Sequence, residues 1–199
     1  MDRLATGLIH LGIKPGDRVG IWGPNSSEWV LVQLATAKIG AIMVCINPAY
    51  RLYELEYALN KVECKTLITD VSFKTSDYLR MINTLAPELE SSQPGQLEAE
   101  KLPHLKHVIR MGSDTTPGMY NFDAVCSAGT ADDQAAMDAM LATIAKIFPG
   151  IAAASWILMN IINCAMAQRF LAAADKNIRP KPVYSDIEIP SWPAGIVVL

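Results

Sequence analysis

One uncharged stretch, residues 147–168, sets the strongest constraint on how this chain can fold. It contains 22 residues without Asp, Glu, Lys or Arg. As an α-helix it would be roughly 33 Å long, about the apolar thickness of a bilayer. The residues before about 130 instead alternate short apolar segments with amphipathic helical segments, as in water-soluble α/β proteins. Any function assigned to the chain must account for both parts.

The composition excludes several classes of protein. The 199 residues allow one domain, or a small domain with an appendage, and the net charge of −3 without a Lys/Arg run argues against a nucleic-acid surface. The cysteines are widely spaced, lie in apolar runs and form no CxxC, so we expect reduced, buried thiols rather than a zinc site or disulfide framework. They are Cys45, Cys64, Cys126 and Cys164. The first residues lack the apolar core of a signal peptide, so we expect a cytoplasmic front part.

The spacing of apolar residues predicts a parallel sheet with βαβ crossovers, an α/β fold. We expect strands at 18–22, 41–46, 64–69 and 107–111, and the continuous apolar run at 41–46 predicts a strand covered on both faces. We expect helices at 2–11, from Asn25 or Ser26 to Ala37, 52–62, 73–85 and 121–128, with Gly12, Gly40 and Gly129 at helix ends. The polar segment 90–101 predicts an exposed loop.

A series of short motifs follows in a fixed order along residues 1–129. They include LATGL (4–8), LGIKPGDRVGI (11–21), GPNS (23–26), QLATA (33–37), NPAY (47–50) and ELEYAL (54–59), with Trp29, Gly40-Ala41, Lys74-Thr75, Pro94-Gly95, Leu102-Pro103 and Pro117-Gly118. In this order and spacing the segment resembles the N-terminal part of AMP-forming (adenylate-forming) acyl-CoA synthetases. Within them it looks most like the medium-chain fatty acyl-CoA ligase type.

The resemblance implies a fatty acid–CoA ligase, which activates a carboxylate with ATP and Mg²⁺ and transfers the acyl group to coenzyme A. In that family a Ser/Thr/Gly-rich loop ending in Pro-Lys-Gly cradles the phosphates. It would follow some tens of residues after Gly129, and we do not find it in this chain. We therefore carry over no catalytic, cofactor-binding or metal-binding residue, and expect the chain alone to be inactive.

Two other patterns resemble binding sites. Residues 112–118 (GSDTTPG) have the composition of a phosphate loop, but they lack its Lys and no strong helix follows, so a solvated turn is the favoured interpretation. His104 and His107 are three residues apart, without a nearby carboxylate or Cys to complete a metal site, so we interpret them as a solvated loop pair.

The remaining candidate side chains have structural explanations. His10 is expected at a helix boundary, and Ser26 and Ser27 as helix-capping residues. Trp22 and Trp29 are expected to pack under the sheet edge, with lining of an acyl pocket as the alternative. Glu54 and Glu56 are two residues apart, so on a helix they point to different faces; Glu54 is expected to cap or to form a salt bridge.

The last third leaves several interpretations open. We expect a helix to about Phe148, an interruption at Pro149-Gly150, and a second helix to about Ala174, within a helical segment 130–175. Residues 148–168 then form a transmembrane helix, a helix docked on a soluble domain, or a surface-binding helix, although the basic face that a surface-binding helix needs is missing. The tail 176–199 is rich in Pro and expected to be extended.

The charges beside the apolar stretch conflict with the enzyme-like front part. Arg169 and Lys176 follow the stretch whereas Asp132 and Asp138 precede it, which places the front part outside the cytoplasm by the positive-inside tendency. Residues 148–192 also faintly resemble an uncharacterised family of bacterial multi-spanning membrane proteins. The alternatives to a ligase fragment are therefore a membrane-associated binding or scaffold protein, and a non-native fusion of two unrelated gene fragments.

Overall fold

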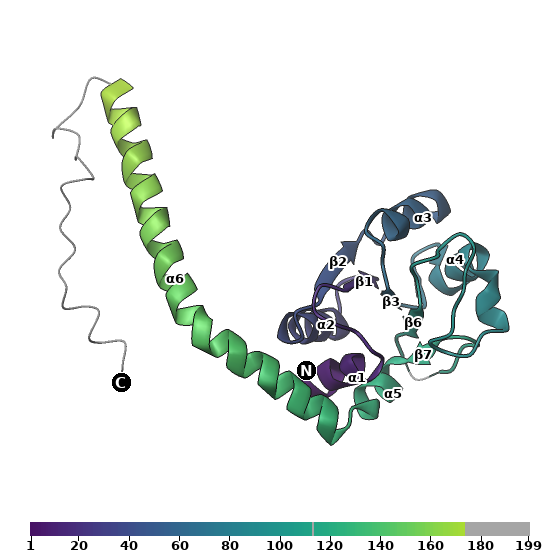
Figure 1. Ribbon diagram of the computed structural model, residues 1–199. Helices are drawn as coiled ribbons and strands as arrows, with labels where there is room; N and C mark the ends of the chain where they lie inside the picture. Colours follow the sequence, from purple (N-terminus) through teal and green to yellow (C-terminus); the bar gives the residue numbers. More distant parts are fainter. Residues whose placement is uncertain (113, 174–199) are drawn as a thin grey trace. The chain divides into compact units, whose positions relative to one another are not determined.

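The computed structural model of the protein describes residues 1–112 and 114–173 (Figure 1). The chain divides into two compact units, Met1–Ile144 and Ala145–Leu199. The first unit contains the whole sheet and the shorter helices, and the described part of the second unit is helical.

The first unit is built on a five-stranded, entirely parallel sheet, which confirms the predicted α/β fold. The strand order is β2-β1-β3-β6-β7. The bounds are β1 Arg18–Trp22, β2 Ile42–Ile46, β3 Thr66–Thr69, β6 His107–Arg110 and β7 Tyr120–Asn121. After β2 the chain returns to the other side of β1, so the order reverses between β1 and β3. In open α/β sheets such a reversal is where ligand crevices form.

Helices cover both faces of this sheet. One face carries α1 (Asp2–His10), α2 (Ser27–Lys38) and α5 (Phe122–Ala128), whose side chains share one apolar core. The other carries α3 (Leu52–Lys61), α4 (Tyr78–Leu85) and the short 3₁₀ helix η1 (Pro87–Glu90), which share a second core. Strands β1, β3 and β6 contribute fully buried side chains to both cores, as expected for interior strands of a parallel sheet.

Local sequence signals explain the helix ends. The hydroxyl of Ser26 accepts a hydrogen bond from the backbone N–H of Trp29 at 3.3 Å and begins α2, as predicted. Gly12, after α1, has φ 79°, which a residue with a side chain rarely adopts. The Glu54 carboxylate accepts from the backbone N–H of Arg51 at 3.2 Å and begins α3, which confirms its predicted capping role.

Two expectations about the first unit were wrong. Strand β2 was expected to be covered on both faces, but it lies at the sheet edge and Ile42 is 52% exposed. The helix expected at 73–85 begins only at Tyr78, because a hairpin of β4 (Ser72–Phe73) and β5 (Ser76–Asp77) precedes it. In that hairpin Lys74 has φ 54°, which is incompatible with a helix.

Two further features differ from the sequence-based expectation. The two-residue strand β7 was not predicted. It is a strand because it pairs with β6, and its own composition does not indicate one. The polar segment 90–101 is an exposed loop only in part, since Leu97 and Ala99 are buried in the core and hold it against the unit.

Helix α6 runs from Ala131 to Ala173. At its start the N–H of Asp133 donates to the Thr130 hydroxyl, and the N–H of Thr130 donates to the Asp133 carboxylate, a reciprocal cap. The predicted interruption at Pro149-Gly150 was wrong, because Pro149 lies inside a continuous helix. An interior Pro costs about 3 kcal/mol relative to Ala, and the helix nevertheless continues through it. The expected tail, 176–199, lies outside the described residues.

Candidate functional site

The carboxyl ends of β1 and β3 are the part of the sheet where a ligand is expected to bind. The strand order reverses there, and Gly23 lies against Asp70: a Cβ added to Gly23 would be 3.2 Å from the Asp70 Cβ. The N–H of Asp70 donates to the Trp22 carbonyl at 3.0 Å, and the Asp70 carboxylate accepts from the N–H of Val71 at 2.7 Å. A local backbone contact therefore engages one oxygen of the Asp70 carboxylate.

Trp22 and Tyr78 fill the space beside this point. Their ring centroids are 3.9 Å apart, and both side chains are fully buried. The Trp22 indole N–H donates to the Asn47 carbonyl at 3.2 Å, and the Tyr78 hydroxyl donates to the Pro48 carbonyl at 2.7 Å. Burial of this phenol raises its pKa, so it stays protonated at neutral pH. The network fastens the turn after β2 and confirms the predicted packing role of Trp22.

The described residues of the GSDTTPG segment, Gly112 and 114–118, are held as a turn rather than as a phosphate cradle. The Arg110 guanidinium, which is 6% exposed, donates to the carboxylate of Asp114 at 2.8 Å and also to its carbonyl. The Asn121 amide donates to the carbonyl oxygens of Gly112 at 2.6 Å and Asp114 at 3.2 Å. These carbonyl oxygens point inward, whereas a phosphate site needs converging N–H groups. The solvated-turn interpretation is thus the one that fits the geometry.

The histidines do not form a joint site. His104 is exposed, whereas His107 is the first residue of β6 and is only 8% exposed, so their interpretation as a solvated pair was wrong for His107. Burial lowers the pKa of His107 to about 4, helped by the nearby Lys65 ammonium, and its Nδ1 has no hydrogen-bond partner. His10 ends α1, as predicted, and its Nδ1 lies 3.1 Å from the Asp133 carboxylate.

A cavity of about 520 Å³ lies at the amino ends of the strands, beside His107. His10, Gln96 and Tyr120 are among its lining residues. The Tyr120 hydroxyl, however, is engaged with the Pro94 carbonyl at 3.0 Å, and Gly95 lies so close to that hydroxyl that a Cβ there would overlap it. The polar groups at this cavity are therefore largely engaged in contacts within the protein. The cavity also lies at the opposite end of the strands from their carboxyl ends, where ligands usually bind.

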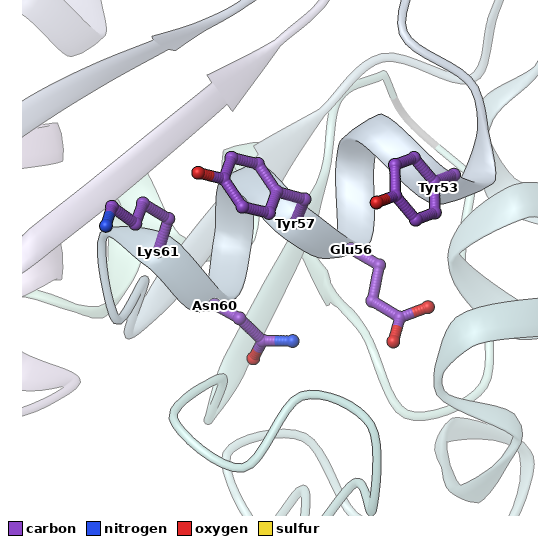
Figure 2. A pocket seen from close by; sticks show the side chains of 5 residues that line it. All are labelled: Tyr53, Glu56, Tyr57, Asn60 and Lys61. Carbon is purple, nitrogen blue, oxygen red and sulfur yellow. The ribbon is translucent and has the colours of Figure 1, made fainter.

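A second hollow, of about 440 Å³, lies along the outer side of α3 (Figure 2). All of its lining side chains come from this one helix: Tyr53, Glu56, Tyr57, Asn60 and Lys61. Figure 2 shows Glu56 and Asn60 extending to one side of the helix and Tyr57 to the other. Glu54 caps the helix instead of joining Glu56, so no carboxylate pair forms. The hollow is open and lacks converging polar groups.

The cysteines differ from one another in exposure. Cys64 is buried and burial raises the pKa of its thiol to about 11, but Cys45 and Cys164 are exposed and Cys126 is half-buried. The expectation of four buried thiols was therefore wrong for Cys45 and Cys164. It failed for Cys45 because β2 is an edge strand, and for Cys164 because it lies on an uncovered helix.

Two observations on the described residues concern Mg²⁺ and the phosphates of ATP. Within residues 1–112 and 114–173 no three His, Cys, Asp or Glu side chains gather to hold a metal ion. The one loop with phosphate-loop composition presents carbonyl oxygens to Arg110 and Asn121, as described above. Sequence inspection did not identify these two anchoring residues, because only the fold brings them to the loop.

Comparison with known proteins identifies the family of the first unit. A family described as "AMP-binding enzyme" matches residues 1–144, through the first part of α6. The chain belongs to this family. The mitochondrial medium-chain acyl-CoA ligase of Bos taurus is 48% identical over 130 residues, covering 65% of this chain and 21% of the relative. The same ligase of Danio rerio is 42% identical over 130 residues, with the same coverage of 65% and 21%.

Solved structures of this enzyme group share the fold. The anthranilate CoA ligase AuaEII, solved with anthranoyl-AMP, matches with a TM-score of 0.53 and 25% identity over 64% of this chain and 21% of that chain. Acetoacetyl-CoA synthetase from Streptomyces lividans matches with a TM-score of 0.52 and 23% identity, over 65% and 20%. This chain spans about a fifth of the length of the curated relatives it matches.

Helix α6 is the other feature that needs a functional explanation. Of the helices in the described part of the chain, α6 alone, over Ala131–Leu171, is long and apolar enough to cross a bilayer, and an 18-residue stretch of it has a mean hydropathy of 1.6. This test rests on length and composition. Large apolar side chains are exposed along the helix, among them Phe148 at 62% and Trp156 at 70%.

Proposed function

We propose that residues 1–144 provide the N-terminal part of the adenylating domain of an AMP-forming carboxylate–CoA ligase. The observation that carries the proposal is the match of the whole first unit to the AMP-binding enzyme family, with 48% identity to a medium-chain acyl-CoA ligase. By this similarity the acid is a medium-chain fatty acid, and the reaction consumes ATP and coenzyme A. The relatives are mitochondrial enzymes by name; the cytoplasmic location expected from the sequence stays a prediction.

The same proposal holds that this chain does not activate the acid by itself. Transition-state stabilisation in phosphoryl and adenylyl transfer depends on donors placed around the phosphates. Among the described residues, Asp70 at the carboxyl end of β3 accepts a backbone hydrogen bond, and the loop after β6 presents carbonyl oxygens. These groups are acceptors rather than donors. The missing donors would come from the parts that the relatives carry beyond the matched region.

Acid-dependent exchange of pyrophosphate into ATP tests both halves of this proposal. The purified chain alone, with Mg²⁺ and octanoate, should give no exchange above that of a buffer blank. The chain co-expressed with the unmatched part of the bovine ligase should give exchange that depends on octanoate. Exchange by the chain alone would contradict the proposal that it is inactive by itself. A folded complex without exchange would contradict the proposal that residues 1–144 provide part of the adenylating domain.

A second candidate function, membrane association, is favoured by one observation. Every side chain described between residues 145 and 173 is at least partly exposed, and most of the large ones are apolar. We propose that the segment 148–168 inserts into a bilayer beside other helices, because Asn160 and Asn163 lower its own tendency to insert. Membrane fractions washed with alkaline carbonate should retain the chain but release a variant with Ile157→Lys and Ile161→Lys. Release of the unsubstituted chain would refute insertion.

A further inference from the structure

The beginning of α6 belongs to the first unit. The first compact unit and the match to the AMP-binding enzyme family both end at residue 144, inside α6. Before that point the helix packs against the unit: Met137 is 1% exposed and lies in the apolar core that α1, α2 and α5 share. We call residues 131–144 the strap.

One carboxylate fastens the N-terminal end of the strap to α1. Oδ2 of Asp133 accepts hydrogen bonds from the N–H of Thr130 at 2.8 Å and from its hydroxyl at 2.7 Å. The same oxygen lies 3.1 Å from Nδ1 of His10, the last residue of α1. The cap of α6 and the end of α1 therefore meet at one oxygen atom, and Met137 enters the core about one turn further along.

Beyond Met137 the strap is loosely packed. Met140 and Leu141 are half-buried, and Ile144 is 43% exposed. A hollow of about 300 Å³ lies between this end of the strap and the end of α2. Its lining residues are Pro15, Lys38, Ile39 and Gly40 on one side and Met140, Thr143 and Ile144 on the other. Few apolar contacts are therefore lost when the strap separates from the unit, and segments of this kind open at low free energy.

The sheet of the same unit is held more firmly. Strands β1 and β3 pair with a neighbouring strand along both edges, and Ile21 and Ile68 within them are fully buried. These side chains reach solvent only when the core as a whole is lost. Release of the strap requires less, because within residues 131–144 it removes one fully buried side chain and the contact between His10 and Asp133.

We propose that the strap opens and closes as a local unit while the sheet and α1 stay folded, with Met137 and the His10–Asp133 contact as its two fastenings. The proposal is independent of the ligase function proposed above. Separation begins at the loosely packed end beside the hollow. It uncovers the apolar face that Met137 shares with Leu141 and Ile144, at spacings of four and three residues. The strap thus switches an apolar helix face between a covered and an uncovered state.

Thiol labelling of the full 199-residue chain in detergent micelles tests the proposal. The variant Met137→Cys places a thiol at the buried fastening, and alkylation followed by peptide mass mapping compares it with two natural thiols of the same molecule. Cys64 is buried in the core beneath α3 and α4, and Cys45 is exposed. The introduced thiol should react at least about thirtyfold faster than Cys64, which needs unfolding of the unit, and at least about thirtyfold more slowly than Cys45.

Further substitutions in the Met137→Cys background separate local opening from unfolding of the whole unit. Ile82→Val shortens a fully buried side chain of α4 in the core that holds Cys64, so it should speed labelling of Cys64 about fivefold and leave the introduced thiol unchanged. His10→Ala removes one fastening and should speed labelling of the introduced thiol about threefold. His104→Ala, at an exposed position in a loop, is the matched control and should have no effect.

Three results would overturn the proposal. They are labelling of the introduced thiol as slow as that of Cys64, an equal response of both thiols to Ile82→Val, and labelling as fast as that of Cys45, which would show that the strap is not fastened. If Met137→Cys fails to fold, oxidation of Met137 by hydrogen peroxide in the unsubstituted chain decides. Met137 should be oxidised about tenfold faster than Met119, which is 5% exposed in the other core, and equal rates refute a local opening.

Discussion

Gly7 of α1 lies directly against the backbone carbonyl of Val125 in α5, so closely that a Cβ added to Gly7 would overlap the carbonyl group. The two helices share one face of the sheet and the same apolar core. Their close approach explains a glycine in the middle of a helix, where it otherwise costs about 0.5–1 kcal/mol relative to Ala.

Replacing this glycine should destabilise the first unit. Because the atom that must give way belongs to the backbone, Gly7→Ala should lower the free energy of unfolding by about 1–3 kcal/mol, measured in urea. Gly150→Ala is the control, since nothing lies within 4 Å of the Cβ it would add. It should leave unfolding of the first unit unchanged, and equal effects of the two substitutions would contradict the packing described.

Stability should depend on pH through His107. Its folded pKa is about 4, below the usual pKa of 6.5 for an exposed imidazole, so the unfolded chain binds the proton more tightly than the native protein. Stability is therefore complete above about pH 6.5 and falls as the pH drops toward 4, by at most about 3 kcal/mol. Urea titrations at several pH values measure this decline.

The two histidines provide a matched pair for that experiment. His107→Gln removes the titrating group and should flatten the dependence between pH 6.5 and 4, whereas His104→Gln, at an exposed position, should retain it. If the free energy of unfolding of His107→Gln depends on pH as steeply as that of the unsubstituted protein, another group titrates in this window.

The thiols should react at very different rates. Cys45 and Cys164 are exposed, while Cys64 is buried with a pKa of about 11, which leaves almost no thiolate at pH 7.5. Alkylation of the native protein in detergent, followed by peptide mass mapping, should find Cys45 modified first and Cys64 modified only after unfolding. Early modification of Cys64 would contradict its placement in the core beneath α3.

Asn121 has two separable roles. Its carbonyl oxygen caps α5 by accepting from the N–H of Asp123 at 2.9 Å, and its amide holds the carbonyl oxygens of Gly112 and Asp114. Asn121→Ala loses both roles and should cost about 1–2 kcal/mol.

The aspartate variant separates the cap from the loop. Asn121→Asp keeps an acceptor for the Asp123 N–H but cannot donate to the loop, so the Asp123 amide should stay protected from hydrogen exchange in it and lose protection in Asn121→Ala. Equal protection in both variants would show that the side chain does not cap the helix.

The sequence pattern was sufficient for much of the fold because local signals determine it. Glycine at positive φ after α1, the Ser26 cap and the alternation of apolar strands with amphipathic helices identify β1, α2 and the crossovers without tertiary information. The interior character of IMVCI was also read from the residues, but the position of β2 at an edge depends on strand order, which no local signal encodes.

The candidate site was less predictable for a related reason. Arg110 and Asn121 are ordinary residues at the ends of β6 and β7, and they matter only because the sheet brings both to the loop between them. Likewise, the burial of His107 follows from its register opposite Thr66 of β3. Pairing and context decided these positions.

Direct measurement of nucleotide binding tests the central claim most sharply. In isothermal titration calorimetry of the purified 199-residue chain with MgATP, with and without octanoate, the account predicts no saturable heat up to about 1 mM nucleotide. A one-to-one isotherm with a Kd of about 100 µM or tighter would contradict it, because the described residues would then hold ATP without the rest of the enzyme.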